Sequence, residues 1–230
     1  MKELGIIGGL GPLATADFYR MIVKETPASF DQEHINVWIR SLASTPKRVE
    51  FIRGESTEDP SGALCKTARE LADLGADILV MPCITAHYFY ERIQASVSVP
   101  LLNAVDITAS YLRERQFKRA GFLGTEAIIE SGYLEDRFSA QGIKLLTPAA
   151  KEQALVKRII FEEIKKDRPP EISALKQVIG ALIMQGAEAV LLGCSELSTI
   201  ENVGELSDSF LIVDMMRLLA KEAVRLCRSS

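Results

Sequence analysis

Short apolar runs alternate with longer amphipathic stretches along the whole chain. The runs are rich in Val, Ile and Leu, which is typical of strands buried on both faces of a parallel sheet. They are Leu4–Ile7, Asn36–Ile39, Asp77–Met81, Pro100–Leu102, Ala120–Leu123, Ala189–Leu192 and Phe210–Val213. Strands separated in this way by longer segments indicate an α/β fold with parallel sheets.

The stretches between the runs have the spacing of helices. Their apolar residues recur every three or four positions, so that one face of each stretch is apolar. The stretches are Ala14–Lys24, Gly62–Leu74, Asp106–Arg115, Ser131–Gln141, Ala154–Lys165, Ile172–Gln185 and Met215–Arg228. We expect each of them to be a helix packed against a sheet.

An internal repeat divides the chain into two similar halves. Leu71–Cys83 reads LADLGADILVMPC, and Leu182–Cys194 reads LIMQGAEAVLLGC. In each segment a Gly precedes the Cys by eight positions, and the two cysteines are 111 positions apart. Earlier in each half, Leu4–Gly8 resembles Ala120–Gly124. The repeat therefore predicts two pseudo-symmetric α/β domains that arose by duplication.

The expected domains are residues 1–108 together with 215–230, and residues 109–214. The last helix is expected to return to the first domain, because it has no room to cross over to another strand. Ligands of parallel sheets bind beyond the carboxyl ends of the strands. Cys83 and Cys194 both follow a predicted strand directly, so we expect an active site in the cleft between the domains with one thiol on each side.

Two opposed thiols suit the inversion of a carbon centre by proton transfer. One thiolate removes a proton from one face of the carbon, and the opposing thiol delivers a proton to the other face. The α-proton of an amino acid is far less acidic than a thiol, so donors around the substrate carboxylate must stabilise the carbanionic intermediate. The Gly-rich turn Gly8–Gly11 precedes a predicted helix and is a source of such donors.

Composition and charge narrow the class of protein. The 230 residues are 47% hydrophobic and 25% charged, which is typical of a globular protein and excludes a disordered chain. The net charge of −4 gives no basic surplus for nucleic acid. No apolar run approaches the ~20 residues that span a bilayer, and the Gly-rich start does not resemble a secretion signal. We expect a cytoplasmic protein without nucleic-acid or membrane partners.

Four segments carry a resemblance to a known family. They are GIIGGLGPLATADFY (Gly5–Tyr19), DQEH (Asp31–His34), MPCITAH (Met81–His87) and GCSEL (Gly193–Leu197). Together they resemble the aspartate/glutamate racemase family, most closely its aspartate racemase branch, over nearly the whole chain. The resemblance implies a two-base racemase that needs no cofactor, pyridoxal phosphate included. It also implies a homodimer that acts on a small acidic amino acid.

The resemblance also implies roles for individual residues. Cys83 and Cys194 match the catalytic pair, and Arg48 and Lys165 match basic residues that bind the substrate carboxylate. Lys166 is an adjacent alternative to Lys165. The expected substrate-binding residues in full are Gly9, Leu10, Arg48, Ile84, Thr85, Thr125, Lys165 and Ser195.

Some positions depart from the family pattern or allow two interpretations. Ile84 stands where the family has Asn, and Ser195 stands where it has Thr. His87 and Glu196 either support the two cysteines or are ordinary helix residues. No metal site is expected, because no further ligands cluster near Cys83 and His87.

Other functions stay open at this stage. The chain is alternatively a glutamate racemase or a racemase of broader specificity. A maleate cis–trans isomerase or a decarboxylase of the same superfamily would use one cysteine. A binding protein without catalysis is the third possibility, and Ile84 is the reason to consider it.

Overall fold

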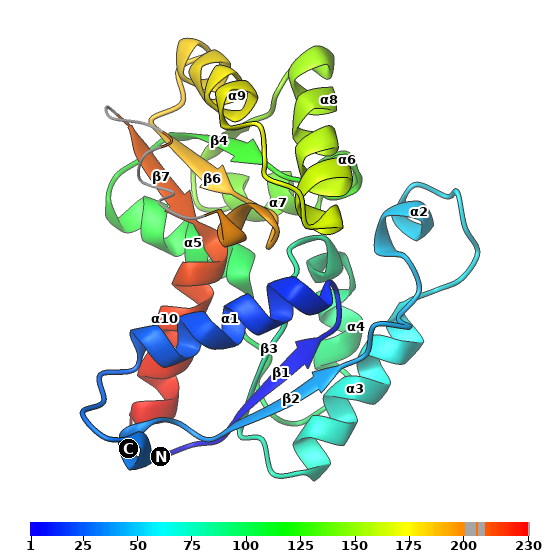
Figure 1. The fold of residues 1–230 in the computed structure, drawn as a ribbon, viewed down its shortest axis with the longest axis vertical. Coiled ribbons are helices and arrows are strands. Elements are labelled where there is room, and N and C mark those ends of the chain that lie inside the picture. Colours follow the sequence, from blue (N-terminus) through cyan, green and yellow to red (C-terminus); the bar gives the residue numbers. More distant parts are fainter. Residues whose placement is uncertain (201–205, 207–209, 230) are drawn as a thin grey trace. The chain divides into compact units, whose positions relative to one another are not determined.

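The computed structural model describes residues 1–200, 206 and 210–229, and the chain divides into two compact units (Figure 1). Unit 1 comprises Met1–Ile107 and Met216–Ser230, and unit 2 comprises Thr108–Met215. Each unit contains a parallel sheet with helices. The predicted α/β class with two parallel sheets is therefore confirmed.

The sheet of unit 1 contains, within the described residues, three parallel strands. They are β1 (Leu4–Gly8), β2 (Val37–Ser41) and β3 (Ile78–Val80), in the order β2-β1-β3. A single parallel bridge between Leu79 and Leu101 continues the sheet beyond β3. The strand predicted at Pro100–Leu102 is thus reduced to one bridge, in which the N–H of Leu79 donates to the carbonyl of Pro100 and the N–H of Leu102 donates to the carbonyl of Leu79, both at 2.8 Å.

The prediction that Asn36–Ile39 is buried on both faces is wrong. β2 pairs with β1 alone among the described residues, so it forms an edge of the sheet. Trp38 and Ile39 remain 40% and 42% exposed. An apolar run does not by itself distinguish an edge strand from a central one.

The longer helices of unit 1 follow the predicted segments closely, whereas two five-residue helices, Arg48–Ile52 and Tyr90–Gln94, were not predicted. The helices are α1 (Pro12–Glu25), α2 (Arg48–Ile52), α3 (Ser61–Asp73), α4 (Tyr90–Gln94) and the first residues of α5 (Ala104–Glu114), with short 3₁₀ turns at Asp31–Glu33 and Thr85–Phe89. α10 (Met215–Arg228) belongs to unit 1 from Met216 onward. Lys2 N–H donates to the carbonyl of Cys227 at 2.9 Å, and Arg217 pairs with Glu25, so α10 is tied to both β1 and α1.

The sheet of unit 2 contains, in its described part, four parallel strands. They are β4 (Arg119–Leu123), β5 (Lys144–Leu146), β6 (Ala189–Leu192) and β7 (Leu211–Asp214), in the order β5-β4-β6-β7. The sequence analysis missed β5, which is a short edge strand with an exposed Lys at its start. The helices are α6 (Glu126–Glu130), α7 (Tyr133–Ser139), α8 (Ala150–Arg158) and α9 (Ile172–Met184).

One predicted helix of unit 2 changes type along its length. The segment Ala154–Lys165 was expected to be uniform, but α8 starts earlier, at Ala150, and ends at Arg158. A π turn follows at Ile159–Glu163, and a 3₁₀ turn follows at Ile164–Lys166. π turns inside helices are uncommon and are often found at functional sites.

The duplicated packing is visible at a glycine in the first strand of each unit. A Cβ added to Gly5 would lie 3.2 Å from Cβ of Leu71, and one added to Gly121 would lie 3.1 Å from Cβ of Leu182. Leu71 and Leu182 are the first residues of the two repeat segments. In each unit the missing side chain therefore lets the helix before the cysteine strand pack closely on the sheet.

Candidate active site

Cys83 lies just beyond the carboxyl end of β3, in an apolar environment. It is 6% exposed and packs in a cluster with Ile7, Leu10 and Met81. Within the described part of the chain we find no hydrogen bond from its Sγ atom. The next residue, Ile84, is 1% exposed and brings no polar group to this position.

His87 holds the backbone of this loop rather than the thiol. Its Nδ1 lies 2.9 Å from the carbonyl oxygen of Cys83, and the N–H of Ala104 donates to its Nε2 at 3.1 Å. Nε2 must carry no proton to accept that bond, so the proton is on Nδ1 and the ring is neutral. His87 thus contacts the peptide group of Cys83, and a role in supporting the thiol stays a prediction.

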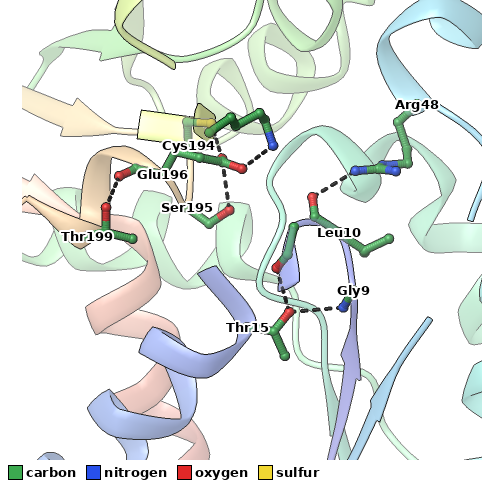
Figure 2. Close-up of polar contacts among 10 residues, drawn as sticks. Gly9, Leu10, Thr15, Arg48, Cys194, Ser195, Glu196 and Thr199 are labelled. Carbon is green, nitrogen blue, oxygen red and sulfur yellow. Dashed lines mark hydrogen bonds and ion pairs between the residues drawn. The ribbon is translucent and has the colours of Figure 1, made fainter. Parts of the chain in front are cut away.

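The Gly-rich turn after β1 is held by two side chains. Figure 2 shows Gly9 N–H directed at Thr15 and the Leu10 carbonyl directed at Arg48; the distances are 3.0 and 2.7 Å. Gly9 has φ +85, and an added Cβ would lie 2.4 Å from the backbone of Leu42, so this position requires glycine. Arg48 also donates to the carbonyl of Pro46 at 3.3 Å. Two of its guanidinium nitrogens are therefore already engaged by the protein.

Cys194 lies in the equivalent place, just beyond the carboxyl end of β6, but it has charged neighbours. Its Sγ donates to Oε2 of Glu196 at 2.9 Å, and Ser195 Oγ lies 3.2 Å from the same oxygen (Figure 2). Lys165, on the 3₁₀ turn after α8, forms an ion pair with Oε1 of Glu196. The structure thus brings together Cys194, Ser195, Lys165 and Glu196, all four of which the sequence analysis named.

Glu196 is ionised in spite of its burial. Burial by itself raises the pKa of this carboxyl group, but the positive charge of Lys165 and the hydrogen bonds from Cys194 and Lys165 outweigh it. The net pKa of Glu196 therefore lies below its ordinary value. The proton in the contact with Cys194 accordingly belongs to the sulfur.

Thr125 and Gln153 mark the carboxyl end of β4. Thr125 is 6% exposed and immediately precedes α6. Gln153 of α8 donates from Nε2 to the carbonyl of Gly124 at 2.9 Å. Its Oε1 is buried and has no hydrogen-bond partner among the described residues. Gln153 was not predicted, because a Gln beside Lys151 and Glu152 has the pattern of an exposed helix face.

The remaining predicted residue, Thr85, is 6% exposed and begins the 3₁₀ turn after Cys83.

All four cysteines are free thiols, and Cys227 is buried in α10. Burial is the main cause that raises the pKa of Cys227 to about 11, which disfavours the nucleophilic thiolate form. Searches of the described residues found neither a group of three or more metal-ligating side chains nor a helix suited to crossing a membrane.

Comparison with known families identifies the family to which the chain belongs. The sequence model of the Asp/Glu/Hydantoin racemase family matches residues 7–223. The chain belongs to this family, and the resemblance inferred from its motifs is confirmed.

Individual relatives cover nearly the whole length of the chain. The broad specificity amino-acid racemase RacX of Bacillus subtilis (strain 168) is 28% identical over 225 residues, which are 96% of each chain. The structure of the aspartate racemase of Picrophilus torridus has a TM-score of 0.85 at 27% identity, covering 99% of this chain and 94% of that one. A glutamate racemase of Francisella tularensis has a TM-score of 0.67 at 14% identity, covering 98% and 80%, and this likeness shows the fold alone.

Proposed function

We propose that this protein is an amino-acid racemase that interconverts L- and D-aspartate without a cofactor, with Cys83 and Cys194 as its two bases. The observation that carries the proposal is the equivalence of the two thiols. Each follows the same strand of its own sheet, and each is 6% exposed. In both loops the N–H three residues after the cysteine donates to the cysteine carbonyl, at 3.2 Å for Ala86 and 2.9 Å for Leu197.

In the proposed reaction the two thiols exchange roles with the direction of turnover. A thiolate takes the α-proton, so that a C–H bond breaks and an S–H bond forms. The opposing thiol then gives its own proton to the other face of the same carbon. The intermediate carries negative charge into the α-carboxylate, and donors held ready at that carboxylate lower the barrier. Thr85, Thr125 and Ser195 are the side chains that we propose for this role.

The contacts of Arg48 and Lys165 bear on their assignment to the second carboxylate of the substrate. Arg48 donates to the carbonyls of Leu10 and Pro46, and Lys165 is paired with Glu196. This observation favours a second candidate, an amino-acid racemase of broad specificity, because an engaged cation discriminates less strongly for an acidic side chain. Similarity to the broad-specificity racemase of Bacillus subtilis supports the same candidate. In either case we propose a cytoplasmic homodimer.

The test is proton exchange by the purified chain in D2O with no cofactor added. L-Aspartate, L-glutamate and a neutral and a basic L-amino acid are followed by proton NMR and chiral chromatography. Loss of the α-proton signal with appearance of D-aspartate alone supports the first candidate, and exchange of several amino acids supports the second. Exchange of none of them overturns both.

A covalent adduct provides the control for the isomerase alternative. A cis–trans isomerase that uses one cysteine as a nucleophile would accumulate an adduct with maleate. Mass spectrometry of the intact chain after incubation with maleate would reveal the added mass on Cys83 or Cys194. The proposed racemase is expected to show none.

A further inference from the structure

The ion pair between Lys165 and Glu196 differs from the pair that the next residue, Lys166, forms with Glu162. The side chain of Glu196 is only 8% exposed, whereas the side chain of Glu162, which pairs with Lys166, is 58% exposed. An exposed pair contributes little to stability, and a buried carboxylate needs several partners to stay charged. Glu196 has them: the Cys194 thiol, the Ser195 hydroxyl and the Lys165 ammonium group.

Among the described residues, charged side chains of two elements lie at Cys194. Glu196 follows it in the same loop, and Lys165 lies on the 3₁₀ turn after the π turn at Ile159–Glu163. Lys165 Nζ also lies 5.8 Å from the ring centroid of Phe161. The other side of Cys194 packs in an apolar cluster that includes Leu123, Leu192 and Leu197.

A thiolate beside an ionised carboxylate is unfavourable. With Sγ and Oε2 2.9 Å apart, loss of the thiol proton would bring two negative charges together and would also remove a hydrogen bond. We propose that Glu196 holds Cys194 in the protonated thiol form in the substrate-free enzyme, and that Lys165 is the positioning residue that holds Glu196 in place.

The consequence for the reaction rests on the proposed racemase function. Cys194 is the proton donor of the resting enzyme, and Cys83 is the thiolate that takes the α-proton first. One turnover leaves Cys83 as a thiol and Cys194 as a thiolate. The resting state returns when solvent delivers a proton to Cys194 and removes one from Cys83. The free enzyme is therefore prepared for one enantiomer in preference to the other.

The Cys83 loop lacks this arrangement. Thr85 occupies the place that Glu196 has in the repeat, two residues after the cysteine. A neutral hydroxyl does not oppose a thiolate as a carboxylate does. The difference between the two thiols therefore follows from the residue two positions after each cysteine.

The test is an ultraviolet titration of thiolate absorbance, which does not depend on racemisation. The Cys83→Ala variant is titrated, and the curve of the Cys83→Ala/Cys194→Ala variant is subtracted to isolate Cys194. Both cysteine variants are then titrated again with Glu196→Gln added, and again with Lys165→Gln added. Circular dichroism checks that each variant is folded.

The two substitutions should move the midpoint of the Cys194 titration in opposite directions. Glu196→Gln removes the opposing charge and lowers the midpoint by about one pH unit or more, whereas Lys165→Gln removes the compensating charge and raises it. A merely structural role would move both in the same direction. Glu162→Gln, which alters the exposed pair of Lys166, is the matched control and should leave the midpoint unchanged.

Opposite results would overturn the inference. If Glu196→Gln raises the midpoint, Glu196 activates the thiol as a base instead of holding its proton. If neither variant moves it, the ion pair has no influence on Cys194. Should Glu196→Gln fail to fold, the upward shift expected of Lys165→Gln still decides the matter. Failure of the racemase proposal would appear separately, as absence of proton exchange by the unaltered chain.

Discussion

The loops after β3 and β6 share a backbone arrangement but differ in their chemistry. In both, a buried cysteine follows the strand and a 3₁₀ turn follows the cysteine. Cys83 has apolar neighbours and a neutral His87 on its carbonyl, whereas Cys194 donates to a carboxylate that is paired with Lys165. Duplication therefore preserved the position of the thiol, while its electrostatic environment diverged.

A second difference lies where each loop meets the following helix. In the first half, His87 accepts from the N–H of Ala104, the first residue of α5. In the second half, Ser198 stands in the place of His87, and its hydroxyl donates to Asp214 at 2.7 Å, just before α10. The same connection is thus made by two different hydrogen-bonding pairs, which shows that the connection and not the residue type is retained.

Removal of either thiol should have the largest effect. Cys83→Ala and Cys194→Ala are each expected to lower racemisation at least about 100-fold, because each deletes one of two proton-transfer groups. Circular dichroism and thermal unfolding should show a folded protein. Chiral chromatography measures the rate, and Cys65→Ala, on the half-buried face of α3, is the control. Near-normal turnover in either variant would contradict the two-thiol mechanism.

Replacing His87 or Ser198 by Ala should lower the free energy of unfolding by unequal amounts. His87→Ala leaves the buried N–H of Ala104 without its acceptor and opens a cavity, so we expect a loss of about 2–4 kcal/mol in the free energy of unfolding. Ser198→Ala removes one hydroxyl bond and should cost about 1–2 kcal/mol. Chemical denaturation measures both. Equal losses would show that the ring of His87 contributes no more than a single hydrogen bond.

Gly193, the residue before Cys194, should tolerate no side chain. A Cβ there would lie 1.9 Å from the ring of Phe122, so Gly193→Ala is expected to cost about 1–3 kcal/mol. The first half has Pro82 at the equivalent position. Gly180→Ala, within α9, meets no atom within 4 Å and should instead raise the free energy of unfolding by about 0.5–1 kcal/mol. Denaturation curves that move in the same direction for both variants would contradict this packing.

The smallest expected effect is a dependence of folding stability on acidic pH, which arises from Glu196 in unit 2. The pKa of Glu196 is lower in the folded chain than its ordinary value of 4.5. Its ionised form therefore stabilises the fold above that value, and this contribution is lost as the pH falls through the lower folded pKa. The stability difference between the unaltered chain and Glu196→Gln should shrink on acidification. A difference that grows below the ordinary value would mean that Glu196 is protonated in the fold.

The repeat made much of this arrangement predictable from the sequence. The matching repeat segments predicted two parallel sheets, and the described residues form them. The return of the last helix was predicted separately, from the lack of room for a crossover, and α10 lies in unit 1 from Met216 onward. The edge position of β2 was not predictable, since Trp38 and Ile39 have the composition of a buried strand. The π turn before Lys165 was also missed, because it leaves the apolar spacing of a helix almost unchanged. Lys165 lies just after that turn, and its bond to Glu196 links residues 31 positions apart.

The most direct test of the two-thiol claim is where deuterium first appears. L-Aspartate, or another amino acid that the chain accepts, is incubated in D2O and sampled early in the reaction, and each enantiomer is analysed by mass spectrometry. With two bases, the thiol that donates already carries solvent deuterium, so the new D-enantiomer contains deuterium while the remaining L-enantiomer does not. Transfer of the original proton to the product, or equal early labelling of both enantiomers, would indicate a single base and contradict the account.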